Sequence, residues 1–327
     1  MAIGTNMDFT ESGVHSNCQK LDAVLPLTLK DYERFKILQC SLNAFCKDIL
    51  GNVWIVVPDA QFAEISQRVN QKNFCVIAES TLIPELKFFS IKGWYLQQLV
   101  KLSIVSRIKT EFYLTLDADV ICTKPIQFSD LVKDDRAVYY AVDSDRYENR
   151  LWYDWSRNVL KLELLAKHNC YNVTPAVLSR NVVIQLQQYL KQLSIAELTS
   201  AIKFSDSKRR NFVLLLSWLC CRVLPKKSIL REQLLDYKAY LIRNIPWTEY
   251  ALYYSFCEMQ GLLDEYHVRV PNCIYSGKES VWHADQYTKW QPESWFEGDR
   301  DFFFCVFQSN TEISAEVIWQ KVEKFLC

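Results

Sequence analysis

The chain has 327 residues, of which 50% are hydrophobic and 23% are charged, a composition typical of a globular protein rather than of a disordered or membrane-embedded chain. Lys plus Arg and Asp plus Glu both number 38, which argues against a protein built to coat nucleic acid. This length allows one large α/β domain or two smaller parts that share a core.

Leader, cysteines and hydropathy point to the cytoplasm. The first twenty residues are polar and lack the apolar segment of a signal peptide. The 12 cysteines are irregularly spaced without a C-x-x-C pair, which argues against a zinc cluster. Cys75 and Cys305 stand in apolar segments, as small core residues do in a reducing compartment. No apolar run reaches the roughly 18 residues that indicate a transmembrane helix.

The first part of the chain alternates between strand-like and helix-like patterns. Apolar residues recur at a helical period in the stretch LKDYERFKILQCSLNAFC and again over residues 93–108. The strands predicted around these helices cover residues 21–28, 52–59, 74–80 and 112–120. This alternation predicts a parallel sheet with right-handed crossovers, which binds ligands outside the carboxyl ends of its strands.

The second part of the chain is predicted to be more helical. A fifth strand is expected over residues 137–145 and ends in Asp143 and Asp145. Residues 181–260 look mostly helical, late strands are expected in HVRVPNCIYS and FFFCVFQS, and ISAEVIWQKVEKFL predicts an amphipathic terminal helix. We therefore divide the chain into four parts. A polar leader (residues 1–20) precedes a Rossmann-like part that binds the nucleotide sugar (21–146). An intimately packed acceptor-side part (147–311) and a terminal helix (312–327) follow.

The stretch FYLTLDADV carries the clearest chemical signal. Asp117 and Asp119 follow a buried-looking strand directly, where ionised side chains need a partner. Carboxylate oxygens suit Mg²⁺ or Mn²⁺, which keep several waters and bridge substrate phosphates. Two acids that merely cap a turn are the structural alternative, and we favour the metal interpretation.

A second enzyme class also uses D-x-D after an apolar strand. Haloacid dehalogenase-like phosphatases carry D-x-D-x-T/V at the end of their first strand. Here Ile121 takes the fifth position, and three strand-like segments precede the pair. This layout departs from the phosphatase pattern, which therefore stays the alternative.

The order of four segments resembles the GT-A glycosyltransferases, which use nucleotide sugars and a D-x-D metal motif. GWYLQQLVKL, FYLTLDADV, NVTPAVLSR and WTEYALYY are similar to segments of an uncharacterised, mainly bacterial glycosyltransferase-like family, over roughly residues 20 to 300. The resemblance implies a GT-A (Rossmann-like), mostly parallel central sheet flanked by helices, with a helical and mixed acceptor-side subdomain. It also implies transfer of a sugar from a nucleoside-diphosphate sugar to a hydroxyl acceptor.

The resemblance also implies a metal site. Asp119 would bind Mn²⁺ or Mg²⁺, and Asp117 would reach the metal or the ribose and take part in catalysis. His283, in VWHADQY, would be the third protein ligand. His267 and His168 are rival candidates, and a packed or surface histidine is the structural alternative.

Donor binding is predicted on one helix and one strand end. Trp94, Gln97, Gln98 and Lys101 recur at helical spacing within residues 93–108. In the fold that the resemblance implies, this helix borders the nucleotide, Lys101 balances phosphate charge and the glutamines read the base. The same fold geometry would put the base beside the first strand's end, at Pro26, Leu27 and Thr28.

Acceptor-side candidates lie further along the chain. The resemblance implies that Thr174-Pro175-Ala176 lines the sugar pocket. Glu249, between aromatic neighbours, would orient donor hydroxyls or act as general base; an acid in the first turn of a helix is the alternative. Asp143 and Asp145 fit a turn better than a sugar contact.

The sequence therefore predicts a metal-dependent glycosyltransferase with a role in surface glycan synthesis, and with a nucleotide sugar and a glycan or other hydroxyl acceptor as partners. A D-x-D phosphatase and an inactive GT-A scaffold that binds glycans are the alternatives. We expect no nucleic acid partner and no transmembrane segment, and any membrane contact would be peripheral, through stretches such as RLWYDWSR.

Overall fold

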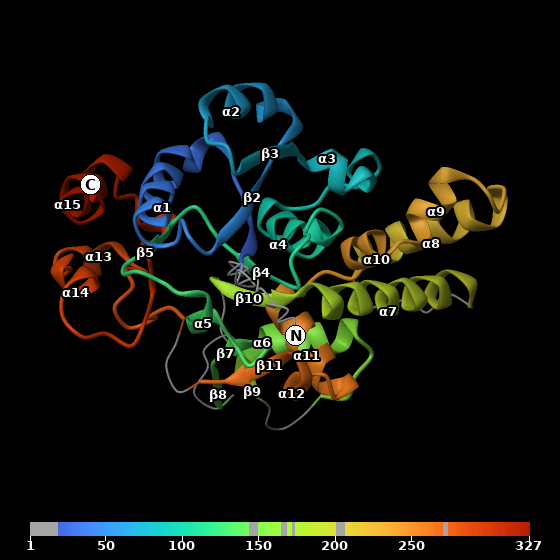
Figure 1. Cartoon of the computed structure of the whole chain (residues 1–327). Helices are drawn as coiled ribbons and strands as arrows, with labels where there is room; N and C mark the ends of the chain where they lie inside the picture. The colour runs from blue at the N-terminus through green and yellow to red at the C-terminus, as the bar shows by residue number, and fades with distance from the viewer. Residues whose placement is uncertain (1–18, 144–149, 165–168, 172–173, 201–206, 271–273) are drawn as a thin grey trace, which may run out of the picture.

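The computed structural model describes residues 19–143, 150–164, 169–171, 174–200, 207–270 and 274–327. Its centre is a five-stranded sheet in the order β10-β4-β1-β2-β3 (Figure 1). These strands are β1 Leu21–Pro26, β2 Leu50–Val57, β3 Phe74–Ala78, β4 Phe112–Thr115 and β10 Ala176–Ser179. β1 to β4 are mutually parallel and β10 is antiparallel at the edge, so the predicted mixed α/β fold with a mostly parallel sheet is confirmed.

Helices cover both faces of this sheet. α1 (Tyr32–Phe45) packs Phe35 and Leu38 against Ala23 and Leu25 on one face. α4 (Gly93–Ser103) packs on the other face, in the cluster that contains Val24. Neighbouring residues of a strand point to opposite faces, which is why β1 contributes to both cores. The helix predicted to reach residue 108 ends as an α-helix at Ser103 and continues as a 3₁₀ turn, Ile104–Ser106.

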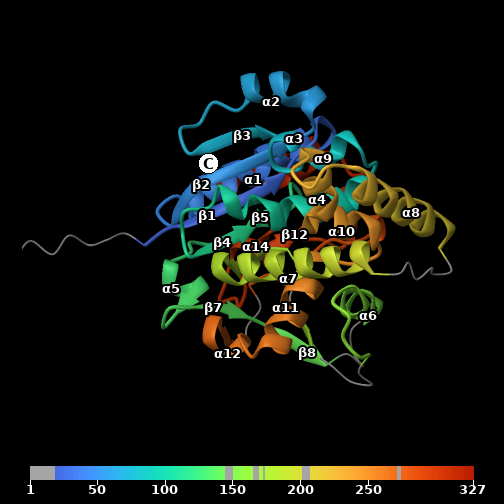
Figure 2. The ribbon, with the colours of Figure 1, turned by 90° about the vertical axis from the view of Figure 1, so that its right-hand side faces the viewer.

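The helical second half completes the core on the α4 side. α7 (Arg180–Thr199) lies between α10 (Tyr237–Arg243) and α11 (Glu249–Gln260), as Figure 2 shows. Their apolar side chains join the same hydrophobic cluster as α4. β10 comes from the predicted acceptor-side part and yet forms the edge of the central sheet. The two predicted parts thus share one core.

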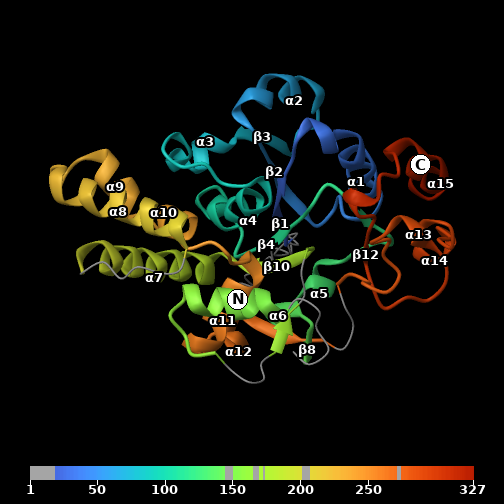
Figure 3. The same cartoon turned by 180° about the vertical axis from the view of Figure 1, so that it is seen from behind.

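The C-terminal segment returns to the first helix. β12 (Phe304–Val306) pairs antiparallel with β5 (Val120–Cys122), and α15 (Ala315–Leu326) packs Ile318 and Val322 against Ile37 of α1. Figure 3 shows α13 (Ala284–Tyr287) and α14 (Glu293–Phe296) beside them. The predicted amphipathic terminal helix is confirmed.

The predicted fifth strand is wrong in extent. It is divided into β7 (Arg136–Tyr139) and β8 (Ala141–Asp143), which pair in separate small sheets, and Asp145 lies outside the described residues. β7 pairs with β6 and β11 in a separate sheet, so it is not a member of the central sheet. The remaining elements are α2 Phe62–Arg68, α3 Glu79–Leu82, α5 Phe128–Leu131, α6 Arg150–Val159, α8 Lys208–Val223, α9 Ile229–Leu235, α12 Leu263–Tyr266, β6 Val132–Lys133, β9 Asn169–Tyr171 and β11 His267–Arg269.

The described residues contain neither a disulfide nor a helix that could span a membrane. The ten cysteines within the described ranges are all free thiols. Cys305 is buried as predicted, whereas Cys75 is only half-buried. Across the described ranges, no helix combines the length and hydropathy needed to cross a bilayer.

Candidate functional site

A cavity of about 700 Å³ opens where the central sheet changes its winding direction. β1 lies between β2 and β4, and the connections through α1 and α4 run on opposite faces. A crevice therefore forms beyond the carboxyl ends of β1 and β4, the place where open α/β sheets bind ligands. Pro26, the last residue of β1, and Asp117, two residues beyond β4, both line it.

Most of the predicted site residues line this one cavity. They are Pro26, Trp94, Gln97, Gln98, Lys101, Asp117, Asp119, Thr174, Glu249 and His283. They come from β1, α4, the β4–β5 turn, the segment before β10, the start of α11 and the start of α13. Sequence reasoning thus selected side chains that the fold brings together across more than half of the chain.

The aspartate pair occupies the turn between β4 and β5 rather than the strand itself. The Val120 amide donates to the Asp117 carbonyl at 3.2 Å and closes the turn. Asp119 is held from the C-terminal segment: its Oδ2 accepts from the Ser309 amide at 2.9 Å, and its carbonyl accepts from the Phe307 amide at 2.8 Å. The two carboxylates therefore have different supports within one cavity.

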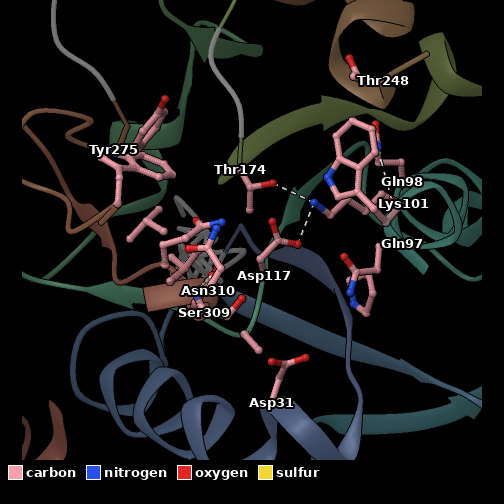
Figure 4. Close-up of a pocket in the computed structure, with 18 of the residues that line it drawn as sticks. Asp31, Gln97, Gln98, Lys101, Asp117, Thr174, Thr248, Tyr275, Ser309 and Asn310 are labelled. Carbon is pink, nitrogen blue, oxygen red and sulfur yellow. Dashed lines mark hydrogen bonds and ion pairs between the residues drawn. The ribbon is translucent and has the colours of Figure 1, made fainter. Parts of the chain in front are cut away.

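Asp117 is paired with the buried ammonium group of Lys101. The Lys101 Nζ lies 2.8 Å from Asp117 Oδ1 and 3.1 Å from Glu249 Oε1, and it donates to Thr174 Oγ1 at 2.7 Å (Figure 4). The Thr174 hydroxyl also bonds the Tyr250 hydroxyl, at 2.6 Å. The side chains of Lys101 and Glu249 are 3% and 5% exposed, whereas that of Asp117 is 37% exposed, so the network is buried except where Asp117 faces the cavity.

Burial and neighbouring charges both shift the pKa values of the groups in and beside this network. Burial lowers the pKa of Lys101, but Asp117, Tyr250 and Glu249 outweigh it and raise that pKa well above its ordinary value. Burial raises the pKa of Glu249, and the Lys101 charge opposes the rise. Burial also raises the pKa of Asp119 to about 6, and the Asp117 charge adds to this effect. A buried acid of this kind gains by facing a cation.

Glu249 is a helix-start acid and also lines the cavity. It is the first residue of α11, and Thr248 caps that helix by accepting from the Ala251 amide at 3.3 Å. Its own amide donates to Gln98 Oε1 at 3.1 Å. The favourable helix-start position therefore also fixes a buried carboxylate at the cavity wall.

The histidines have separate positions. His283 lines the cavity at an exposed position and is the N-cap of α13, where its carbonyl accepts from the Gln286 amide at 3.1 Å and its own amide donates to Gln286 Oε1 at 3.0 Å. His267 is buried elsewhere, with Nε2 2.7 Å from the Tyr253 hydroxyl, and it does not line the cavity. His168 lies outside the described residues. Within the described ranges, no three His, Cys, Asp or Glu side chains are grouped closely enough to hold a metal by themselves.

The burial of His267 predicts a pH-dependent stability. Burial lowers its pKa to about 3, whereas an unfolded histidine titrates near 6.5. Below pH 6.5 the unfolded chain therefore binds a proton that the folded chain does not, so stability is full above that pH and is lost as the pH falls towards 3. His267→Gln should flatten the free energy of unfolding against pH by up to about 1.4 kcal/mol per pH unit between pH 6 and 4. Urea unfolding at several pH values measures this, and equal slopes in the two proteins would contradict it.

Three residues that were predicted to lie at the ligand site do not line the cavity. Thr28 does not line the cavity, and its hydroxyl instead donates to Asp31 Oδ2 at 2.9 Å, because the chain turns into a 3₁₀ helix there. Leu27 is buried in the core beneath the cavity wall, and Ala176 pairs with Thr115 inside the sheet. Asp143, for which a turn was the favoured interpretation, is the last residue of β8.

Sequence reasoning missed several wall residues: Asp31, Trp152, Tyr275, Trp282, Ser309 and Asn310. Trp152 belongs to the stretch predicted for membrane contact, but it lines the cavity with its ring 5.8 Å from that of Trp94. Asp31 follows the carboxyl end of β1, a position from which it could have been predicted. The loop after β12 gives no local signal, because its place depends on pairing with β5.

The cavity wall carries more negative than positive charge. Among the described residues that line it, four carboxylates, from Asp31, Asp117, Asp119 and Glu249, stand against the single ammonium of Lys101. An anionic ligand would meet net repulsion here unless a cation entered with it. The wall therefore favours a cation, or an anion accompanied by one.

Comparison with known proteins identifies a family without an assigned activity. Residues 18–327 match the model of a family of unknown function, DUF6492, and the chain belongs to that family. No curated protein matches the sequence.

Proposed function

We propose that this protein is a nucleotide-sugar-dependent glycosyltransferase of the GT-A type, which transfers a sugar from a nucleoside diphosphate to a hydroxyl acceptor. The observation that carries the proposal is the meeting of the D-x-D turn, the α4 face and Glu249 at the winding reversal of the sheet. A parallel Rossmann-like sheet with a carboxylate pair at that point suits a diphosphate held through a divalent cation.

The carboxylates fit a Mg²⁺ or Mn²⁺ ion that is shared with the donor. Asp119 uses Oδ2 for the Ser309 amide and Asp117 uses Oδ1 for Lys101, and each carboxylate has a second oxygen. These ions need only one or two carboxylates when phosphates and water complete the shell, and His283, which lines the same cavity, would be a further ligand. The metal would supply Lewis-acid stabilisation of the diphosphate leaving group.

The buried network orients the reacting groups. Lys101 holds Asp117 and Glu249 at 2.8 and 3.1 Å, and its charge opposes the rise that burial causes in the pKa of Glu249. Glu249 would orient donor hydroxyls, or accept the proton of the acceptor hydroxyl if the reaction inverts. Its position at a helix start, bonded to Gln98, restricts its motion. Preorganised charge of this kind contributes most in a dry site.

The α4 face and α6 would receive the planar part of the donor. Trp94 is partly exposed at the cavity and its ring lies close to that of Trp152. Gln97 and Gln98 stand beside it on the same helix face. Aromatic rings offer stacking surfaces for a base or sugar, and amides offer hydrogen bonds to a base edge.

The proposal is tested by nucleotide-dependent stabilisation and by hydrolysis. UDP or GDP with Mn²⁺ should raise the melting temperature, and one member of a panel of nucleotide sugars should be hydrolysed slowly in the absence of acceptor. Phosphate release from simple phosphomonoesters without any nucleotide requirement would favour a phosphatase instead. Stabilisation by glycans alone, without turnover, would favour an inactive scaffold.

A further inference from the structure

Helix α8 carries apolar side chains on two opposite faces. Its inner face packs Leu214 and Cys221 into a small cluster with Leu198 of α7 and Leu234 of α9. A helix that is apolar all round is normally covered on every side. The outer face of α8 is not covered by the rest of the described chain, so it needs an explanation.

The outer face forms a continuous apolar stripe. Phe212, Leu215, Leu216, Leu219 and Val223 each lie three or four residues from another member of the set, which places them on one side of an α-helix. All five are exposed, from 36% at Leu215 to 83% at Val223. We call these five residues the α8 stripe. Exposed apolar patches of this kind mark sites of contact with another body.

Residues 207–231, which contain α8 and the turn after it, carry charges of one sign, although Glu197 of α7 pairs with Arg210 and Glu232 follows the segment. Between residues 207 and 231 the sequence contains Lys208, Arg209, Arg210, Arg222, Lys226, Lys227 and Arg231 and no Asp or Glu, although the whole chain is neutral. Lys208 lies at the start of the helix, Arg222 near its end, and Lys226 and Lys227 in the turn towards α9, all four exposed. The apolar stripe is therefore bordered by positive charge at both ends.

The position of α8 in the molecule leaves this surface accessible. α7, α8, α9 and α10 form an arm that extends from the central sheet, with α8 and α9 at its far end (Figures 1 and 2). Exposed Ile229, at the start of α9, adds an apolar residue at the tip. None of these residues lines the cavity.

We propose that the α8 stripe and its basic border dock on the surface of an anionic lipid bilayer. Apolar side chains on one helix face enter the boundary between headgroups and acyl chains, and lysines and arginines bind the anionic headgroups. A second copy of the chain fits less well, because stripe-to-stripe packing would bring two basic borders together. Docking through α8 would hold the protein at a membrane. The cavity, which lies at the central sheet, would take no part in the membrane contact.

Vesicle binding by the full chain tests this proposal. The protein should co-sediment with vesicles of phosphatidylcholine and phosphatidylglycerol, much less with phosphatidylcholine alone, and less at high salt. Lys226→Glu with Lys227→Glu should weaken binding by at least about 25-fold, at about fivefold per charge. Leu216→Glu should weaken it by at least about tenfold, because it places a charge at the apolar boundary.

Matched variants separate docking from misfolding. Phe62→Glu alters an apolar side chain of similar exposure on α2, at 39% against 46% for Leu216, and should bind vesicles like the wild type. Lys47→Glu with Lys133→Glu makes the same charge change at exposed positions elsewhere. Equal binding by all variants, or none by the wild type, would overturn the proposal. A dimer in sedimentation that Leu216→Glu dissociates, without vesicle binding, would replace it by self-association.

Discussion

Lys101→Met is expected to cost about 3–5 kcal/mol of the free energy of unfolding and to abolish turnover. The lysine side chain is 3% exposed and its Nζ contacts both Asp117 and Glu249. Removal of one partner from a buried ion pair leaves the remaining charges uncompensated in a medium that solvates them poorly. Asp117 and Glu249 would then repel each other and lose their positions. Urea unfolding and nucleotide-sugar hydrolysis measure the two effects.

Two further variants make the Lys101 prediction specific. Lys101→Met combined with Glu249→Gln should recover at least about 1 kcal/mol, because the second change removes a charge that the first leaves unpaired. Lys92→Met, at an exposed position directly before α4, should change stability by less than about 0.5 kcal/mol. A fully additive double variant would show that the ion-pair network is not coupled.

Asp119→Asn is expected to separate function from stability. It should remove the Mn²⁺-dependent stabilisation by UDP or GDP and lower hydrolysis about 10²- to 10³-fold, because an amide is a poor ligand for a hard cation. The amide oxygen can still accept from the Ser309 amide, as the carboxylate does at 2.9 Å. Burial raises the pKa of Asp119 to about 6, so loss of this charge should leave stability at pH 8 equal or higher.

The control for this variant is Asp301→Asn, the same change at an exposed position near the C-terminal segment. It should keep the nucleotide response and the wild-type rate. A wild-type response in Asp119→Asn would remove the metal from the proposal. A loss of stability in the same variant would point instead to a structural role for the charge.

The parallel sheet could be predicted because its signals are local. Each of the strands β1 to β4 is a short apolar run, with a helical pattern after β1, β2 and β3 and before β4, and parallel strands are buried on both faces. The failure over residues 137–145 has the opposite cause. The composition is equally apolar there, but the partners β11 and β9 lie far along the chain, and pairing rather than composition decides which sheet a strand joins.

The site was predictable where helical spacing or strand ends placed its residues. Trp94, Gln97, Gln98 and Lys101 share one face of α4, and Asp117 follows a strand end. The ion pairs of Lys101 could not be predicted from the sequence, because they join residues separated by 16 and 148 positions. Burial of the lysine decides its partners, and burial depends on α11 packing over α4.

Because β12 pairs with β5, the cavity wall can be completed only after β12 has been synthesised. Asp119 accepts from Ser309, 190 residues later, and Arg34 donates to the carbonyls of Phe307 and Ile313 from α1. At ribosomal speeds of about 5–20 residues per second, roughly 10–40 s separate the synthesis of the aspartate from that of its amide donor. The central sheet can therefore form first, and a nascent chain has no finished binding wall until Ser309 has been synthesised.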